Sequence, residues 1–491
     1  MNPWEQFSEH ISEQHTLIQL IELISWDQET YMPTKAITQR SKQSGFLSGL
    51  LHEKKTHPSF SALLESLCPE NELQKTAIQR AKHAYQRASA VPKDLVEALS
   101  TTKSIATQKW SQAKANNDLA LFLPALQNVI QHTKEYASCF GSAAHPYDNL
   151  LEEFDPGMTT AFLDPMFQAL SEQLSPYVHE QVQKTQPDDL GIFIPKEALS
   201  RINHAIIEAL GFDSDAGRLD ISSHPFTVGM GPHDVRLTTR NLETDFLGSI
   251  GGTIHECGHG LYEQGLPLDY NHLGLCAAAG CGIHESQSRF YENIIGRSLG
   301  FYTWLSPIIY KESGLIIPAE RLYCAANRVS RSFIRVSADE TTYNLHIIVR
   351  YQLEKALLED NLSVHELNDA WNDLYTKTLG ITPPNAKLGL LQDIHWSAGL
   401  FGYFPSYTLG NLFSASYRFA LESAQPSVWK DVSSGNFGHI LQWLRENIHS
   451  KGHTDTQENI VLAAVGTRDH VTDFMTHLKD RHALRDELIS K

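Results

Sequence analysis

Residues 226–238 read FTVGMGPHDVRLT, and their pattern differs from that of the rest of the chain. Apolar and polar residues alternate on either side of Gly231-Pro232, which predicts two short strands joined by a turn. Elsewhere the apolar residues recur at helical spacing, over about 5–26, 36–54, 71–90, 93–115, 117–141, 159–183 and 196–211, and again from Arg240 to the end. We therefore predict a mainly α fold with one small β-sheet.

The length and composition restrict the class of protein. With 491 residues, the chain is long enough for about three domains of ordinary size. Hydrophobic residues make up 41% and charged residues 20%, which excludes a disordered chain, a collagen-like fibre and a disulfide scaffold. The net charge of −17 argues against nucleic acid or an anionic membrane as a partner, because an acidic surface repels both.

The sequence also carries information on location. Its first residues, MNPWEQFSEHISEQHTLIQL, lack the basic start and continuous apolar core of a secretory signal. No stretch has the 18 uninterrupted apolar residues of a membrane span. The six cysteines form no CxxC pair and are expected to be reduced thiols. We therefore predict a cytoplasmic protein.

A candidate metal site lies in residues 255–259, HECGH. On a helix, His255 and His259 are one turn apart on the same face, where two imidazoles can bind one Zn²⁺. Glu256 can reach a zinc-bound water without binding the metal, which suits a general base. The alternative is an ordinary pair of histidines on a helix.

A catalytic zinc needs a third protein ligand and one open position for water. The version with a third histidine, HExxHxxGxxH, fails because Tyr262 and Gly265 stand where glycine and histidine are required. A downstream carboxylate is the other common solution, and the candidates are Glu263, Asp269, Glu285 and Glu292. Spacing favours Glu285, which lies 26 residues beyond His259, far enough for a turn and a second helix. Its alternative role is that of a solvated acid in the first turn of a helix.

Four glycines, at positions 251, 252, 258 and 260, surround this motif. Each costs a helix interior about 1 kcal/mol relative to alanine. A helix that carries this cost is expected to need close approach of a neighbouring backbone or ligand. Cys257 lies about 200° around the helix from each histidine, so we expect it to pack and not to bind the same metal.

Besides HExxH, five short motifs occur in order: HPF at 224–226, DxRxT at 234–238, HESQ at 284–287, IRxxAD at 334–339 and GxxQDxHW at 389–396. With these motifs, and with no departure at a motif position, the sequence resembles the carboxypeptidase Taq family of zinc metallocarboxypeptidases over nearly its whole length. Residues 26–33 and 145–148 also look similar to the family.

This resemblance implies one large helical domain over residues 1–491, with a deep active-site cleft and a small sheet beside the zinc-binding helix. We expect residues 1–220 to form a mostly helical cleft wall and residues 221–491 to bind zinc and substrate. The resemblance implies zinc ligation by His255, His259 and Glu285, with Glu256 as the catalytic acid and base. It also implies a homodimer. Co²⁺ is a possible substitute for Zn²⁺, because imidazole and carboxylate ligands do not decide between them.

A carboxypeptidase must bind the free terminal carboxylate of its peptide substrate, and arginine suits this role because its planar fork makes two-point contacts. The resemblance points to Arg335, with Tyr407 as its hydroxyl partner. Arg350 is the rival, about four turns along the same predicted helix. For either arginine, the alternative is an ordinary ion pair with Asp339, Glu340 or Glu354.

Two further roles are open. The negative charge that develops on the carbonyl oxygen needs a hydrogen-bond donor, and the candidates are His224, His395, Tyr403 and Tyr407. Each of these has the alternative of a structural hydrogen bond. The edge of one predicted strand can also accept a peptide backbone, although Asp234 and Arg236 are as well suited to bracing the strands.

The predicted function is therefore hydrolysis of the last peptide bond of a peptide, which releases single amino acids. A zinc oligopeptidase that cuts internal bonds is the nearest alternative, because it would use the same chemistry. A non-catalytic helical binding protein with a structural metal is the alternative from a different class.

Overall fold

The two predicted strands form as expected. In the computed structural model, which describes residues 2–141, 143–187 and 189–491, β2 (Thr227–Gly229) pairs antiparallel with β3 (Val235–Thr239). A third strand, β1 (Gly217–Ile221), pairs parallel with β3, so the sheet order is β1-β3-β2.

The sequence did not reveal β1 because its burial is the reverse of the usual pattern. Asp220 is buried and bonds to Arg218 and to the hydroxyl of Tyr31, whereas the apolar Ile221 is 57% exposed. In a typical strand the apolar residues are buried and the polar residues are exposed. In β1 a hydrogen-bonded polar residue is buried and an apolar residue is exposed, so the usual alternation cannot identify the strand.

The described residues form two compact units, each assembled from three stretches of the chain. Unit 1 comprises Met1–Ser89, Asp189–Ala326 and Phe413–His470, and unit 2 comprises Ala90–Asp188, Asn327–Leu412 and Val471–Lys491. The helix α16 (Phe404–Ala424) runs from unit 2 into unit 1. The prediction of a single domain divided near residue 220 stays a prediction, and so does the cleft.

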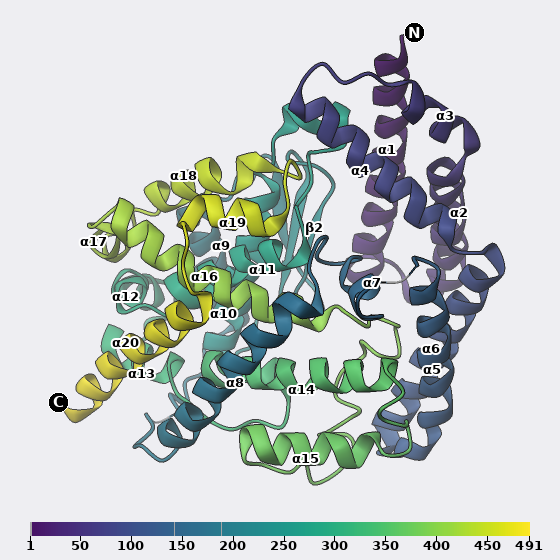
Figure 1. Ribbon diagram of the computed structural model, residues 1–491. Helices are drawn as coiled ribbons and strands as arrows, with labels where there is room; N and C mark the ends of the chain where they lie inside the picture. The colour runs from purple at the N-terminus through teal and green to yellow at the C-terminus, as the bar shows by residue number, and fades with distance from the viewer. Residues whose placement is uncertain (1, 142, 188) are drawn as a thin grey trace. The chain divides into compact units, whose positions relative to one another are not determined.

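Unit 1 holds the sheet and most of the helices (Figure 1). Its helices are α1 (Pro3–Thr30), α2 (Ile37–Thr56), α3 (Pro58–Ser66), α4 (Glu72–Ala90), α9 (Lys196–Leu210), α10 (Phe246–Glu263), α11 (Cys281–Arg289), α12 (Leu299–Ser313), α13 (Ala319–Ala326), α17 (Val428–Ser433), α18 (Gly438–Asn447) and α19 (Gln457–Val465). Short 3₁₀ turns are η1 (Thr34–Ala36), η3 (Leu268–Leu273) and η6 (His449–Lys451), and η4 (Phe290–Ile295) is a π-helix.

Unit 2 contains helices and 3₁₀ turns but no strand among the residues described. Its helices are α5 (Lys93–Asn116), α6 (Leu123–Ser138), α7 (Asp148–Leu151), α8 (Thr160–Gln181), α14 (Glu340–Leu358), α15 (Leu367–Leu379) and α20 (His470–Ser490), with 3₁₀ turns η2 (Leu119–Leu121) and η5 (Arg335–Ser337). In Figure 1, the green helices α14 and α15 lie side by side, and α8 packs against both. The mainly α prediction is therefore confirmed.

Helix boundaries follow the capping chemistry of the sequence. Asn2 and Glu5 form a capping box at the start of α1, where each side chain accepts the other's backbone N–H. The Asp339 carboxylate accepts the N–H groups of Thr341 and Thr342 at the start of α14. The cap of α1 places its start within a few residues of the predicted position. The single helix predicted to carry both Arg335 and Arg350 is wrong, because Asp339 caps α14 and Arg335 lies before it in the turn η5.

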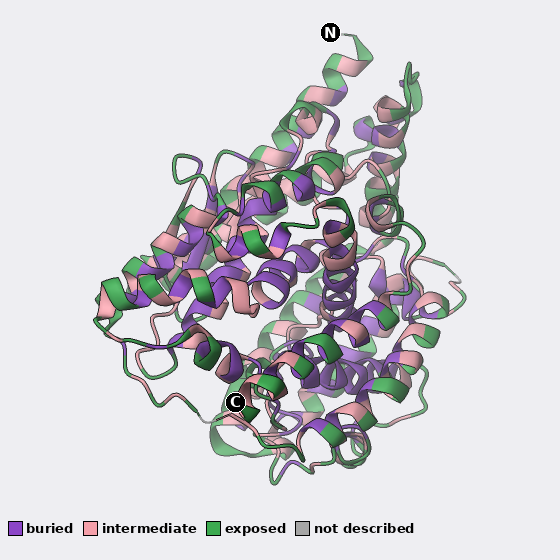
Figure 2. Cartoon of the chain, turned by 90° about the vertical axis from the view of Figure 1, so that its left-hand side faces the viewer, coloured by how far each residue is buried: buried purple, intermediate pink, exposed green. Residues whose placement is uncertain are grey.

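The helices differ in how much of their surface they bury. Helix α1 buries only Phe7, Ile11, Gln14 and Trp26, and Figure 2 shows the N-terminal helix largely in green and pink. Phe7 and Ile11 pack with Phe60 and Leu64 of α3 in a small apolar cluster. In contrast, α14 is buried along most of its length, and its buried residues include polar and charged side chains.

Candidate metal centre

Helix α10 presents the two motif histidines. Asp245 caps it by accepting the N–H of Gly248. His255 and His259 follow ten and fourteen residues later, and their ring centroids lie 4.9 Å apart. Cys257 is fully buried on the other side of the helix, which confirms its predicted packing role. The helical spacing therefore places the two imidazoles as the sequence predicts.

The third candidate ligand comes from α11. Glu285 Oε2 lies 3.3 Å from His259 Nε2 and 3.7 Å from His255 Nε2. One ligand atom from each of His255, His259 and Glu285 falls within 4.8 Å of the others. Within the ranges that the structure describes, no other group of three or more His, Cys, Asp or Glu side chains is arranged in this way. Two imidazoles and one carboxylate are a donor set suited to a catalytic divalent cation such as zinc.

Close packing of α10 on α11 explains part of the glycine content. A Cβ atom on Gly258 would lie 2.6 Å from the carbonyl oxygen of Gln287, and one on Gly260 would lie 2.7 Å from Leu237. The expected close approach of a neighbouring backbone is therefore found at Gly258, whereas side chains approach Gly260. It is not found at Gly251, whose surroundings are open, and Gly252 has only ordinary contact.

The outer ring nitrogens of both histidines have partners. His255 Nδ1 lies 2.8 Å from Glu292 Oε2. His259 Nδ1 lies 2.6 Å from His284 Nδ1, and the other ring nitrogen of His284 lies 2.8 Å from Glu263. Such partners fix the tautomer and orientation of a metal-binding imidazole. Glu263 and Glu292, two of the four candidate third ligands, thus contact histidines in place of joining the cluster.

Burial and neighbouring charges shift the pKa of each candidate ligand in a different direction. Burial alone would lower the pKa of His255, but Glu285 and Glu292 outweigh it and raise this pKa to about 9. Burial lowers the pKa of His259 to about 3. Burial alone would raise the pKa of Glu285, but Arg289 and His255 hold it well below its usual range. These shifts favour an ionised Glu285, a neutral His259 and a protonated His255.

Glu256 is buried beside the sheet. The Thr227 hydroxyl of β2 lies 2.7 Å from Glu256 Oε2 and 2.9 Å from its carbonyl oxygen. Burial raises the pKa of Glu256, and His255 opposes this rise. The strand β2 thus fixes one oxygen of the candidate base. Thr227 was not singled out from the sequence, although it lies directly after the HPF motif.

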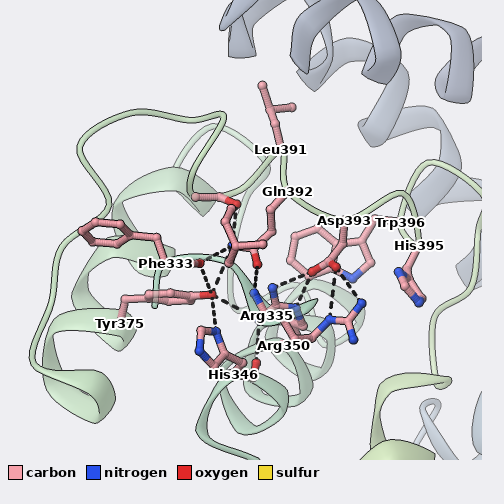
Figure 3. A network of polar contacts seen from close by, with 12 residues as sticks. Phe333, Arg335, His346, Arg350, Tyr375, Leu391, Gln392, Asp393, His395 and Trp396 are labelled. Carbon is pink, nitrogen blue, oxygen red and sulfur yellow. Dashed lines mark hydrogen bonds and ion pairs between the residues drawn. The ribbon is translucent and has the colours of Figure 1, made fainter. Parts of the chain in front are cut away.

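The predicted carboxylate-binding residues gather in unit 2 (Figure 3). Arg335 bonds to Asp393 Oδ1 at 2.9 Å, and Arg350 bonds to Asp393 Oδ2 at 2.7 Å. Asp393 comes from the GxxQDxHW motif and takes the place of the acids weighed as alternatives from the sequence. Two guanidinium groups share this one carboxylate, so the buried cluster has an excess of one positive charge.

The two arginines differ in their surroundings. Arg335 also donates to the Tyr343 hydroxyl at 2.7 Å, and its guanidinium lies 5.0 Å from the centre of the Tyr407 ring. Its side chain is 6% exposed, whereas that of Arg350 is fully enclosed and donates to the His346 carbonyl. Gln392 accepts the N–H of Arg335 and fixes the backbone there (Figure 3).

The remaining candidates fall into both units. In unit 2, His395 Nε2 lies 3.3 Å from the Tyr407 hydroxyl, and the His395 ring stacks on Tyr403. Burial lowers the pKa of His395 to about 4, so its imidazole is neutral near pH 7. His224 belongs to unit 1, where it is exposed and its carbonyl accepts the Ser222 hydroxyl.

A helix with an HExxH motif and a carboxylate supplied by a second helix define a metallopeptidase site. Comparison with known proteins assigns this chain more narrowly: it belongs to the carboxypeptidase Taq (M32) metallopeptidase family, which matches residues 6–482. The chain is therefore a hydrolase of the metallocarboxypeptidase class, and its family implies a metal cofactor.

Individual relatives cover nearly the whole chain. Thermostable carboxypeptidase 1 of Thermus thermophilus is 37% identical over 481 residues, and carboxypeptidase 1 of Bacillus subtilis is 36% identical over 477, each match covering 94% of both chains. The solved structure of Pyrococcus furiosus carboxypeptidase has a TM-score of 0.95 at 33% identity, covering 98% of this chain and 99% of that one. The predicted family resemblance is thus confirmed.

Over the residues that the structure describes, every helix is too short or too polar to cross a bilayer.

Proposed function

We propose that this chain is a zinc-dependent carboxypeptidase that hydrolyses the C-terminal bond of peptides and releases single amino acids. The observation that carries this proposal is the set of His255, His259 and Glu285 beside the buried Glu256. Three protein ligands leave one position open, as a catalytic zinc site requires and a structural site does not.

The ligand set fits the proposed ion by its chemistry. Two imidazole nitrogens and one carboxylate oxygen converge, and both imidazoles have outer hydrogen-bonding partners. When bound, zinc lowers the pKa of a water molecule towards 7 and polarises the carbonyl of the substrate. The same ligands also accept cobalt, so Co²⁺ remains a possible substitute.

Glu256 is proposed as general base and then general acid. Its carboxylate takes a proton from the attacking water and passes it to the nitrogen of the leaving amino acid. The Thr227 hydroxyl holds one carboxylate oxygen at 2.7 Å and leaves the other for this proton transfer. A group held in one geometry loses less entropy in the reaction than a mobile one.

Recognition of the terminal carboxylate is assigned to the cluster of unit 2. Arg335 is the preferred contact, because its side chain retains some exposure and Arg350 retains none. Arg350 and Asp393 then act as positioning residues that orient the Arg335 guanidinium. The excess positive charge of this cluster is the property that would attract a carboxylate.

Tyr407 and His395 are proposed to support this substrate contact. Their side chains lie 3.3 Å apart, and a neutral imidazole beside a hydroxyl can donate a hydrogen bond without adding charge. Stabilisation of the developing negative charge by His395, Tyr403, Tyr407 or His224 stays a prediction for each residue. The homodimer and the cytoplasmic location also stay predictions, and light scattering of the purified protein tests the first.

A pair of matched peptides tests the proposal. We expect amidation of the C-terminus to lower kcat/KM by about 10- to 100-fold. This range corresponds to the free energy of one charge-assisted hydrogen bond, which the amide cannot form. Mass spectrometry of the products also reports which bond is cut. In Arg335→Gln, the free acid and the amide should be cut at similar rates. Equal cleavage of both peptides by the unaltered protein, or cuts at internal bonds, would instead indicate an oligopeptidase.

A further inference from the structure

The guanidinium of Arg289 joins two carboxylates of the metal centre. Its Nε donates to Glu285 Oε1 at 2.6 Å, and its Nη1 donates to Glu292 Oε2 at 3.1 Å. The Arg289 side chain is only 12% exposed, and the two carboxylates are 8% and 16% exposed. The planar fork of arginine suits such a two-point contact, because its donors have a fixed geometry.

Because of this contact with Arg289, the two carboxylate oxygens of Glu285 have different neighbours. Oε1 faces Arg289, whereas Oε2 faces both histidines, at 3.3 Å from His259 and 3.7 Å from His255. The Ser288 hydroxyl also lies 3.1 Å from Oε2. Only Oε2 is therefore directed at the space that the three ligand atoms enclose.

Glu292 links the same arginine to the other ligands. Its Oε2 contacts both Arg289 and His255 Nδ1, and Oε1 lies 3.8 Å from Arg297. A carboxylate on Nδ1 favours a proton on that nitrogen and leaves Nε2 as the ring nitrogen that faces Glu285. Arg289 thus contacts one metal ligand directly and a second through Glu292.

The local helix geometry brings Arg289 close to both carboxylates. Arg289 is four residues after Glu285 and ends α11, so the two side chains lie on the same face. The chain then widens into the π-helix η4, which carries Glu292. Single π-turns of this kind are rare and frequently occur at functional sites.

We propose that Arg289 is a positioning residue of the metal centre, which holds Glu285 to a single metal-facing oxygen and keeps Glu292 on His255. This inference rests on the metal site proposed above. A carboxylate that turned both oxygens to the ion would fill the position needed for water. Arg289 prevents this by occupying Oε1.

Metal binding by Arg289→Gln tests the inference without relying on peptidase activity. We expect competition with a chelator of known affinity to show zinc binding weakened by about 10- to 100-fold. Cobalt-substituted protein should absorb visible light more weakly per ion, because a second carboxylate oxygen raises the coordination number. Zinc affinity and a cobalt spectrum equal to those of the unaltered protein would overturn the inference.

Two further variants separate geometry from charge. Arg289→Lys keeps the charge but offers one ammonium group, so we expect weakened zinc binding and a changed cobalt spectrum here too. If lysine restores both readouts fully, the two-point geometry is not needed and the proposal is wrong. Glu292→Gln removes the partner of His255 and leaves Glu285 on Arg289, so zinc affinity should fall while the cobalt spectrum stays the same.

Separate control experiments test whether each variant is folded and whether the effect is specific to Arg289. Circular dichroism of each metal-free variant reports whether it is folded. If Arg289→Gln is unfolded, the zinc affinity and cobalt spectrum of Arg289→Lys test the inference in its place. Arg297→Gln serves as the matched control, since Arg297 lies near Glu292 and bonds to Asn293 and the Ala326 carbonyl; the cobalt spectrum of this variant should be unchanged. Failure of the proposed peptidase activity would appear separately, as unaltered protein that binds zinc and releases no amino acid.

Discussion

At the scale of single residues, the metal centre is defined by which nitrogen and oxygen atoms face inward. The helical period places His255 and His259 on one face, so this part of the site could be predicted from sequence. Spacing left four acids open as third ligand, and only packing of α11 on α10 shows why Glu285 joins the cluster. The Asp393 partner of Arg335 could not be predicted, because it lies 58 residues away along the chain.

One buried residue outside the metal centre gives the protein a pH-dependent stability. Glu354 of α14 is fully buried and accepts bonds from the Tyr147 hydroxyl, the Trp396 ring and the Gly402 N–H. Burial raises its pKa to about 7, although these donors and Arg350 oppose the rise. The folded state therefore holds a proton that the unfolded chain releases near pH 4.5.

The sign of the effect follows from this difference in proton binding. Between pH 4.5 and 7 the folded state binds more protons than the unfolded state, so the free energy of unfolding falls as the pH rises. The contribution is about 3 kcal/mol in total. We predict that urea denaturation shows this loss in the unaltered protein and that Glu354→Gln lacks it.

A control with the opposite sign strengthens this test. Hydrogen bonding to His145 lowers the pKa of Glu359, so its contribution to stability is lost as the pH falls. Glu359→Gln should therefore leave the decline between pH 4.5 and 7 in place. A decline of equal size in Glu354→Gln would contradict the role assigned to Glu354.

At the scale of elements, the sequence predicted most helices and the β2–β3 hairpin well, but it missed the break between Arg335 and α14 and two further features. It missed β1, because Asp220 is buried through its own partners and Ile221 is exposed. It also missed the π-helix η4, because an extra residue in one helical turn leaves the apolar spacing nearly unchanged. Both features depend on tertiary contacts that local propensity does not contain.

The contact between α10 and α11 leads to a prediction at this scale. In Gly258→Ala, the new Cβ would lie 2.6 Å from the Gln287 carbonyl, so one helix must move. We expect a loss of about 1–3 kcal/mol in the free energy of unfolding. Zinc affinity should also fall, because Glu285 and the two histidines lie on the helices that separate.

Gly251→Ala is the matched control on the same helix. Its Cβ would meet no other atom within 4 Å, so alanine should stabilise the helix by up to about 1 kcal/mol. Chemical denaturation of both variants measures the difference. Equal stability of the two variants would show that the glycine at position 258 is not needed for close packing.

At the scale of the whole molecule, the interleaving of the two units could not be predicted from sequence. Each unit combines three separate stretches of the chain, and local sequence patterns do not show which stretches pack together. The candidate metal centre belongs to unit 1, and the arginine cluster belongs to unit 2. Motif order along the chain does not reveal this division.

Removal of the metal is predicted to destabilise the whole protein. A ligand that binds only the folded state at 100 times its Kd stabilises by about 2.7 kcal/mol. We expect a chelator to lower the Tm measured by calorimetry, and added zinc to restore it. His259→Ala should have a Tm that responds little to either treatment. An unaltered protein with the same Tm with and without bound zinc would contradict this prediction.

The most direct test of the central claim is peptide hydrolysis by Glu256→Gln with its zinc content measured in the same sample. The amide keeps the size and burial of Glu256 but cannot take the proton from water. We predict zinc bound in full and kcat/KM for a free C-terminal peptide lowered by about 10²- to 10⁴-fold. Hydrolysis at the original rate by the fully loaded variant would contradict the assignment of Glu256 as the base.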